Sequence, residues 1–262
     1  MKIVVIGGGN MGSSIVEGLL QGEIFNARDI TVIDINQATL DKLTVLHPKI
    51  QTALNDYKPI TQADIILLAV KPWLIKDVIL EIKPNMNYEK QIVVSIAAGI
   101  NTSEIARYLS EDALLPAIFR VVPNTAIAVR ESITLIATNN ADSRQKKLVQ
   151  SIFDELGTTM FLDEDKIPAG TALTSCGIAY FFRYVRAAMT AGVELGIHPK
   201  QAQEMVVNTM LGAAKLLKET GNHPETEIDK VTTPGGITIK GINELEANGF
   251  TNAIIKAIKA SN

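Results

Sequence analysis

Residues 2–20 read KIVVIGGGNMGSSIVEGLL, and this stretch decides the fold. Its first part is a short β-branched run that predicts a buried strand, whereas the part from Met11 onward has the residue spacing of a helix. Between them, Gly7, Gly9 and Gly12 form the pattern G-x-G-x-x-G. A strand that passes through such a turn directly into a helix is typical of the first unit of a doubly wound α/β domain.

The glycine turn also predicts an anion site. Glycines allow a ligand to approach the backbone closely, and the following helix presents free N–H groups and the positive end of its dipole. In this context the pattern is typical of a site for the pyrophosphate of a dinucleotide, although a merely tight turn is the alternative. The expected cofactor-binding residues here are Ile6, Gly7, Gly8, Gly9, Asn10, Met11 and Gly12.

Asp34 ends the second expected strand, at about the 20-residue spacing that this fingerprint predicts for an acidic residue. Its carboxylate would accept hydrogen bonds from the adenosine ribose hydroxyls, which favours NADH. The 2′-phosphate of NADPH would favour an arginine or lysine, but Ile35 and Asn36 follow instead. Two alternatives stay open, because Asp34 would also serve as a helix-capping residue and a loop can adapt around a 2′-phosphate.

Short apolar runs alternate with helical patterns over the first 160 residues, which predicts parallel strands joined by helices. The runs are KIVVI, ITVID, ADIILLAV, QIVVSIA and AIFRVV. After Asp163 only helical patterns follow. We therefore predict an N-terminal Rossmann-type, doubly wound, mainly parallel sheet over residues 1–162 and an all-helical domain over residues 163–262.

Small and polar residues follow three of the expected strands, in the stretches AVKP, SIAAG and VVPNT. Ligands of doubly wound sheets bind at the carboxyl ends of the strands, and all three stretches lie at that edge. Any one of them taken alone is more often a plain loop. The expected cofactor contacts in this part of the chain are Asn55, Ala69, Val70, Lys71, Pro72, Ile96, Ala97, Ala98, Pro123 and Asn124.

A second glycine turn lies in TTPGGITIKGINELE, residues 232–246. Gly235 and Gly236 expose backbone amides, Thr233 and Thr238 add hydroxyls, and the next helix points its positive end at the turn. From these residues alone, an anion-binding turn and a simple helix N-cap are equally good interpretations.

These blocks resemble the pyrroline-5-carboxylate reductase family over nearly the whole chain. IGGGNMGSSI, LLAVKP, SIAAGI and RVVPNT occur in the family's order, and VTTPGGITIKGINELE resembles its C-terminal motif, which is the most specific of the five. The resemblance implies an enzyme of proline synthesis that transfers a hydride from NADH or NADPH to the imine carbon of 1-pyrroline-5-carboxylate. It assigns substrate binding to Thr233, Gly235, Gly236, Ile237 and Thr238, with Thr238 as the catalytic residue near the imine nitrogen.

The resemblance also implies a homodimer formed by the C-terminal helices, sometimes assembled further into rings. The helical stretches FFRYVRAAMTAGV and VVNTMLGAAKLL carry more apolar residues than one small helical domain can bury, which favours such a partner. In this dimer we expect residues 232–238 to reach the nicotinamide held by the partner chain.

Two departures from the family pattern concern the substrate pocket. Ser175 and Ile178 stand where a glycine and a proline are usual, and Ala126 stands where proline is common. Loss of the proline frees the backbone to continue a helix. Reduction of another small imino or keto acid is therefore one alternative function, and a non-catalytic dinucleotide-binding or scaffolding protein is a separate one.

Composition excludes other classes. With a net charge of −3, the chain has no basic surface for nucleic acid, and its start, MKIVVIGGGN, predicts no signal peptide. The single cysteine, Cys176, gives no disulfide framework and is expected to be a small buried residue of a cytoplasmic protein. His47, His198 and His223 border turn residues and are expected in exposed loops without a metal. Residues 169–193 predict a buried helix, because Arg183 and Arg186 argue against a membrane span.

Overall fold

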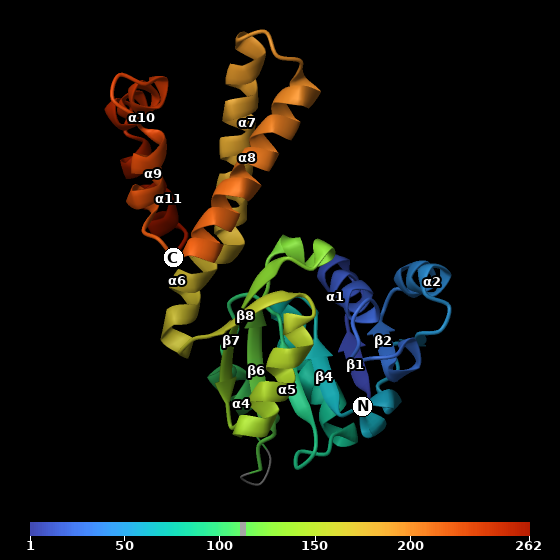
Figure 1. Ribbon diagram of the computed structural model, residues 1–262. Coiled ribbons are helices and arrows are strands. Elements are labelled where there is room, and N and C mark those ends of the chain that lie inside the picture. Colours follow the sequence, from blue (N-terminus) through green and yellow to red (C-terminus); the bar gives the residue numbers. More distant parts are fainter. Residues whose placement is uncertain (111–113) are drawn as a thin grey trace. The chain divides into compact units, whose positions relative to one another are not determined.

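The computed structural model describes residues 1–110 and 114–262. It divides into two compact units, Met1–Ser175 and Cys176–Asn262 (Figure 1). The first unit contains a sheet and the second contains only helices, as the sequence predicts.

The sheet has eight strands in the order β3-β2-β1-β4-β5-β6-β7-β8. All neighbouring strands are parallel except β6 and β7. The strands are β1 Ile3–Ile6, β2 Ile30–Asp34, β3 Gln51–Leu54, β4 Ile65–Leu68, β5 Ile92–Ser95, β6 Ala117–Val122, β7 Ser132–Asn139 and β8 Gly157–Phe161. The chain order reverses at β1, so a crevice for a ligand opens between the carboxyl ends of β1 and β4. The predicted doubly wound, mainly parallel sheet is confirmed.

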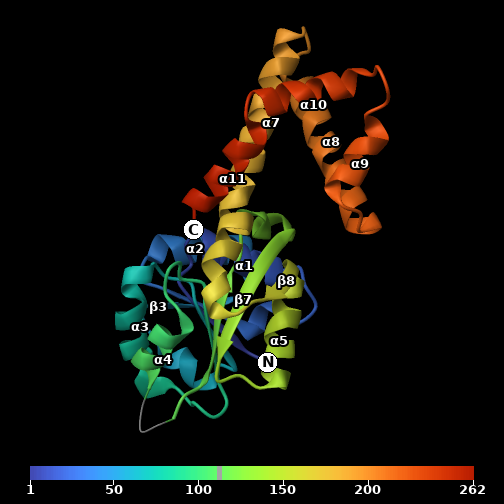
Figure 2. The same ribbon diagram turned by 90° about the vertical axis from the view of Figure 1, so that its left-hand side faces the viewer.

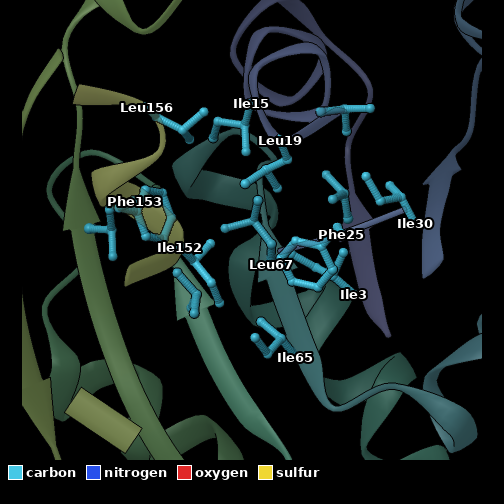
Figure 3. Packing of buried hydrophobic residues seen from close by; sticks show 14 of the residues in the cluster. Ile3, Ile15, Leu19, Phe25, Ile30, Ile65, Leu67, Ile152, Phe153 and Leu156 are labelled. Atoms are coloured by element: carbon cyan, nitrogen blue, oxygen red, sulfur yellow. The ribbon is translucent and has the colours of Figure 1, made fainter. Parts of the chain in front are cut away.

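Helices cover both faces of this sheet, which is why its central strands are apolar at every position. One face carries α1 Asn10–Leu20, α2 Gln37–Leu46 and α5 Ser143–Asp154, and the other carries α3 Ile75–Ile82 and α4 Thr102–Leu109 (Figure 2). Alternate residues of β1 serve the two faces, because side chains of a strand point to opposite sides in turn. Figure 3 shows the first face, where Ile15 and Leu19 of α1 lie over Leu67 of β4.

Three strands, β3, β7 and β8, have no counterpart among the five predicted runs. β3 is a short edge strand that is mostly exposed, so it has no apolar run. β7 follows the antiparallel turn from β6 through the short 3₁₀ turn Thr125–Val129, with no crossover helix to mark it. β8 lies at the edge of the sheet, and its residues are half-buried or exposed in alternation, so it lacks the apolar run of the central strands. Gly157 at its start has a φ of +140° beside the backbone of Ser132, which only glycine accommodates well.

The first compact unit extends beyond β8 through the 3₁₀ turn Glu164–Lys166 and helix α6, Ile167–Thr171. Ile167 is fully buried against Leu135 and Ala137 of β7, which fixes this segment to the sheet. The boundary at residues 162 and 163 stays our prediction for where the two domains separate as folding units.

The second unit consists of five helices among its residues, all of which the structure describes. They are α7 Gly177–Glu194, α8 Pro199–Thr220, α9 Pro224–Val231, α10 Ile237–Ala247 and α11 Phe250–Ala260. The π-helical turn Ala172–Cys176 leads directly into α7, so the helix continues through Ile178, as loss of the family's proline allows. α7 and α8 pack side by side as a helical hairpin (Figure 1).

The prediction of a buried helix over residues 169–193 is wrong for the single chain. Only Gly177 is buried in α7 and only Ala202 in α8, and none of the residues of α9, α10 and α11 is buried. Large apolar side chains are exposed instead; among them are Phe181, Phe182, Tyr184, Met205, Leu211, Leu216, Phe250 and Ile255. So much exposed apolar surface marks an interface rather than a solvated face.

No helix within the described part of the chain combines the length and the apolar character needed to cross a membrane.

Candidate functional site

The turn between β1 and α1 is shaped by two glycines that the fold itself requires. Gly7 has a φ of +104°, and a Cβ atom there would lie 2.6 Å from the carbonyl oxygen of Ala69. A Cβ atom on Gly12 would overlap the carbonyl oxygen of Gly7. Without side chains at these positions, β1, β4 and α1 converge at one point on the carboxyl edge of the sheet.

Gly9 is different, because the protein leaves open space around it. It is exposed, has an ordinary φ of −65°, and a Cβ atom built on it would meet no atom within 4 Å. It is the N-cap residue of α1, and no side chain caps this helix. The N–H groups of the first turn therefore face a space that a ligand phosphate can enter, with no acidic residue in that turn to oppose it.

Asp34 lies beside this turn at the end of β2. Its Oδ2 accepts a hydrogen bond from the Gly8 N–H at 2.7 Å, and its Oδ1 accepts one from the Asn36 N–H at 2.8 Å. The carboxylate thus ties the glycine turn to the β2–α2 loop. Asn55, which follows β3 with a φ of +46°, donates its N–H to the Asp34 carbonyl oxygen at 3.0 Å.

The other expected cofactor residues follow β4, β5 and β6 at the same edge of the sheet. Ala69, Val70 and Pro72 are half-buried after β4, while Lys71 is exposed. After β5, Ile96 is half-buried, Ala97 is buried and Ala98 is exposed. After β6, Pro123 and Asn124 are both buried. The parallel strands therefore bring the residues of all three stretches to one edge, together with Ile6, which is buried at the end of β1.

Asn124 has a structural task that its sequence context did not reveal. Its Oδ1 accepts the Ala126 N–H at 2.9 Å and caps the 3₁₀ turn that follows. Its Nδ2 lies 3.5 Å from the carbonyl oxygen of Thr174, and Ser175 Oγ donates to the carbonyl oxygen of Pro123 at 3.1 Å. The loop after β6 is therefore joined to the π-helical turn.

The second glycine turn repeats the backbone design of the first. Gly235 has a φ of +72°, and Gly236 is the N-cap of α10 with a φ of −67° and a ψ of 169°. Gly9 has nearly the same conformation, with a ψ of −175°. No side chain caps α10 and no acidic residue lies in its first turn, so the N–H groups of Ile237 and Thr238 are presented to solvent.

Among the residues that the structure describes, the three histidines take no part in a cluster of metal ligands. His198 and His223 are exposed N-cap residues of α8 and α9, where Nδ1 accepts the N–H of the residue two positions later, and His47 is half-buried at the end of α2. Cys176, the last residue of the π-helical turn before α7, is half-buried rather than buried as expected. Within the described residues, no three His, Cys, Asp or Glu side chains are grouped to hold a metal ion.

Each of the two glycine turns lies in a part of the chain that matches a known family model. Residues 164–262 match the family model described as pyrroline-5-carboxylate reductase dimerisation, and residues 2–99 match the model described as NADP oxidoreductase, coenzyme F420-dependent. A pyrroline-5-carboxylate reductase of Methanosarcina acetivorans is 36% identical over 99% of this chain and 96% of its own length. The chain belongs to the pyrroline-5-carboxylate reductase family.

Other members of the pyrroline-5-carboxylate reductase family agree. The reductase from Coxiella burnetii has a solved structure that is 33% identical, with a TM-score of 0.90 over 99% of this chain and 95% of that one. The Plasmodium falciparum enzyme, solved with NADP bound, is 26% identical, with a TM-score of 0.85 over 100% and 95%. Reductase 1 of Dictyostelium discoideum is 36% identical over 99% of this chain, which spans 48% of that longer protein.

Two polar groups near the site escaped sequence reasoning. Ser13 Oγ donates to the carbonyl oxygen of Gly8 at 2.6 Å and so braces the glycine turn. Arg120 of β6 forms an ion pair with Glu164, 44 residues away in the chain. The Ser13 contact is local, whereas no local pattern marks the Arg120–Glu164 contact, because it depends on how distant segments meet.

The glycine turn yields a matched pair of substitutions. Gly9→Ala should weaken the binding of reduced nicotinamide cofactor by about tenfold or more while leaving the unfolding midpoint unchanged, because its methyl group enters only ligand space. Gly12→Ala should destabilise the fold itself, because its methyl group meets the Gly7 carbonyl. Calorimetric titration and urea unfolding of both variants measure this. Wild-type cofactor affinity in folded Gly9→Ala would contradict the assignment of the turn.

Proposed function

We infer that the chain reduces the C=N bond of 1-pyrroline-5-carboxylate to give L-proline, with a reduced nicotinamide dinucleotide as the hydride donor. The observation that carries this inference is the uncapped Pro-Gly-Gly turn at the start of α10, in a chain of this family that also has an uncapped glycine turn at α1. The first turn suits the phosphates of a cofactor and the second suits the carboxylate of a small substrate.

The residues present fit the cofactor. A Cβ atom built on Gly9 would meet no atom within 4 Å, so there is room for a pyrophosphate beside it. No side chain caps α1, so the first amides of that helix can donate to the pyrophosphate. We assign cofactor contacts to the turn from Ile6 to Gly12, to Asp34 and Asn55, and to the stretches that follow β4, β5 and β6. When bound, the reduced nicotinamide supplies the hydride.

The work left to the protein is positioning. Once the imine nitrogen is protonated, the imine carbon is already an electrophile. The residues around it therefore need only hold that carbon within reach of the hydride donor and exclude water. We assign the substrate carboxylate to the amides of Gly235 and Ile237 with the hydroxyl of Thr233. The Gly236 N–H already donates to the carbonyl oxygen of Thr233 at 2.9 Å, so Gly236 serves by shaping the turn. We assign to Thr238 a hydrogen bond near the imine nitrogen. Thr238 is exposed in the single chain, so a ligand can reach its hydroxyl.

A spectrophotometric assay tests this function. The purified chain should oxidise reduced nicotinamide when racemic pyrroline-5-carboxylate is added, and Thr238→Ala should lower kcat/KM by about tenfold to a hundredfold, the loss expected for one hydrogen bond to a charged group. Thr232→Ala is the matched control, because the Thr232 hydroxyl is occupied by the carbonyl oxygen of Ile228 at 3.0 Å.

Equal losses in the Thr238 and Thr232 variants would remove Thr238 from the site. Turnover of another small imino or keto acid, with none for pyrroline-5-carboxylate, would identify a different substrate. Tight cofactor binding without turnover of any of them would favour a non-catalytic protein.

We propose that NADH or NADPH is the hydride donor and that Asp34 favours NADH. Asp34 places a carboxylate where the adenosine ribose hydroxyls are expected, and the next two residues supply no cation for a 2′-phosphate. The double substitution Asp34→Ser with Ile35→Arg should shift the ratio of kcat/KM values toward NADPH by about tenfold or more, because a guanidinium pairs well with phosphate. Ile35 is 75% exposed, so the new side chain enters solvent rather than the core.

Asp34→Asn is the control for this change, because it removes the charge but keeps an oxygen acceptor for the Gly8 N–H. Steady-state kinetics with both cofactors give the ratios. A wild-type protein that already prefers NADPH strongly would show that the Asp34 argument is wrong.

We propose that the dimer builds each site from two subunits, with the 232–238 turn of one chain serving the nicotinamide held by its partner. The dimerisation match and the exposed apolar side chains of α7, α8 and α11 support the dimer itself. Assembly of the dimers into a larger ring is part of this proposal. A cytoplasmic location is proposed as well, because one cysteine in 262 residues is typical of proteins from reducing compartments.

Subunit exchange tests the shared site. Mixing Gly9→Ala with Thr238→Ala should restore roughly a quarter of wild-type activity, because random exchange makes half of the dimers mixed and each mixed dimer has one intact site. Sedimentation of tagged chains establishes that exchange has occurred. Proven exchange without recovered activity would mean that each chain builds its site alone, and a fully active monomer would refute the dimer.

A further inference from the structure

Glu164 is the first residue of the 3₁₀ turn that follows β8, and its carboxylate gathers groups from two other elements of the first unit. Oε1 accepts a hydrogen bond from Arg120 Nη1 on β6 at 2.5 Å. Oε2 accepts two bonds from Thr102 at the start of α4, from Oγ1 at 2.6 Å and from N–H at 3.1 Å. One carboxylate thus joins β6, α4 and the segment after β8.

Helix α4 does not need this carboxylate to begin. Its own capping box is complete: the Asn101 side chain accepts the Glu104 N–H at 2.8 Å, and the Glu104 side chain accepts the Asn101 N–H at 3.3 Å. The contact from Glu164 is therefore an addition that fixes where the helix lies rather than whether it forms.

The ion pair between Arg120 and Glu164 costs free energy, because it takes the arginine charge out of water. Arg120 is only 8% exposed, and its Nε is buried without a partner among the described residues. Burial alone would raise the pKa of Glu164, but the hydrogen bonds from Thr102 and Arg120 outweigh it and hold that pKa below its usual value. Only the arginine of this pair is buried, because the Glu164 side chain is 31% exposed, so the pair contributes little to stability. Its geometric effect is to fix the positions of β6, α4 and the segment after β8 relative to one another.

The held segments are the two that border the expected nicotinamide end of the site. The loop from Ile96 to Asn101 runs from β5 straight into α4, so any drift of Thr102 moves Ala97 and Ala98. Arg120 lies on β6 just before the Pro123–Asn124 loop. The hydrogen bonds of the Glu164 carboxylate go to Arg120 and Thr102. The glycine turn, Asp34 and Asn55 belong to β1, β2 and β3 or to the turns that follow them.

We propose that Glu164 is a positioning residue for hydride transfer: it fixes the start of α4, and through it the Ile96–Asn101 loop, against the nicotinamide end of the cofactor. The proposal rests on the proposed function for the identity of the cofactor. It predicts a separation between the two ends of the dinucleotide, because only the nicotinamide end depends on this loop.

Two ligands separate the two ends of the site. ADP-ribose carries the adenosine, the pyrophosphate and the second ribose but lacks nicotinamide, whereas NAD⁺ carries all of them. Calorimetric titration of Glu164→Gln should give wild-type affinity for ADP-ribose, an affinity for NAD⁺ reduced about tenfold, and a kcat reduced by about tenfold or more, since small misplacement is costly in positioning catalysis. The 2′-phosphorylated pair replaces these ligands if the wild type prefers NADPH.

Glu104→Gln is the matched control, because it makes the same change of charge at the same helix end while a glutamine keeps the capping box. It should leave both affinities and kcat unchanged. Thr102→Val removes one donor to Glu164 without changing the charge or the size of the side chain, and it should repeat the effect in weaker form; it also keeps the test decisive if Glu164→Gln does not fold.

Equal losses for ADP-ribose and NAD⁺ in a folded variant would show a general structural role and overturn the proposal, as would wild-type affinities and kcat. Both binding comparisons stand whether or not pyrroline-5-carboxylate is the substrate, so failure of the proposed substrate and failure of this inference are distinguishable.

Discussion

The close backbone contacts of Gly7 with Ala69 and of Gly12 with Gly7 are the constraint on which the rest of the first unit depends. Because no Cβ atom separates them, β1 can turn directly into α1 while β4 passes alongside. That approach sets the position of α1 over the sheet, where Ile15 and Leu19 complete one face of the core (Figure 3). It also aims the uncapped end of α1 at the crevice beside β4, so one packing requirement produces both fold and ligand site.

The glycines of the β1–α1 turn have different roles: two are required by the packing of the fold, and one faces open space. Gly7 and Gly12 serve packing, whereas Gly9 serves a space outside the protein. The Pro-Gly-Gly turn repeats the division, since Gly235 supplies the positive φ and Gly236 supplies the uncapped helix start. The same physical device, the free N–H groups of a helix end, would suit both anionic groups of the proposed function, a pyrophosphate and a carboxylate.

The two units bury their apolar residues very differently. The sheet of the first unit is covered on both faces by its own helices (Figure 2), and its central strands are fully buried. The helices of the second unit bury two residues between them and expose aromatic and aliphatic side chains along their length. The match to a family dimerisation domain explains why this apolar surface is exposed in the single chain. Apolar area of this size is typically buried against a partner subunit.

The sequence by itself determined the strand–turn–helix start, the mainly parallel sheet, the helical C-terminal part and the two glycine turns, because glycine patterns and hydrophobic periodicity are local signals. Only the tertiary structure decided the rest. β3, β7 and β8 could be recognised only from the strands they pair with, and Asn124 proved to be a buried cap rather than a free polar group. The Arg120–Glu164–Thr102 network joins residues 44 and 62 positions apart, and no spacing in the chain encodes that meeting, because it arises only when the segment after β8 packs back onto the sheet.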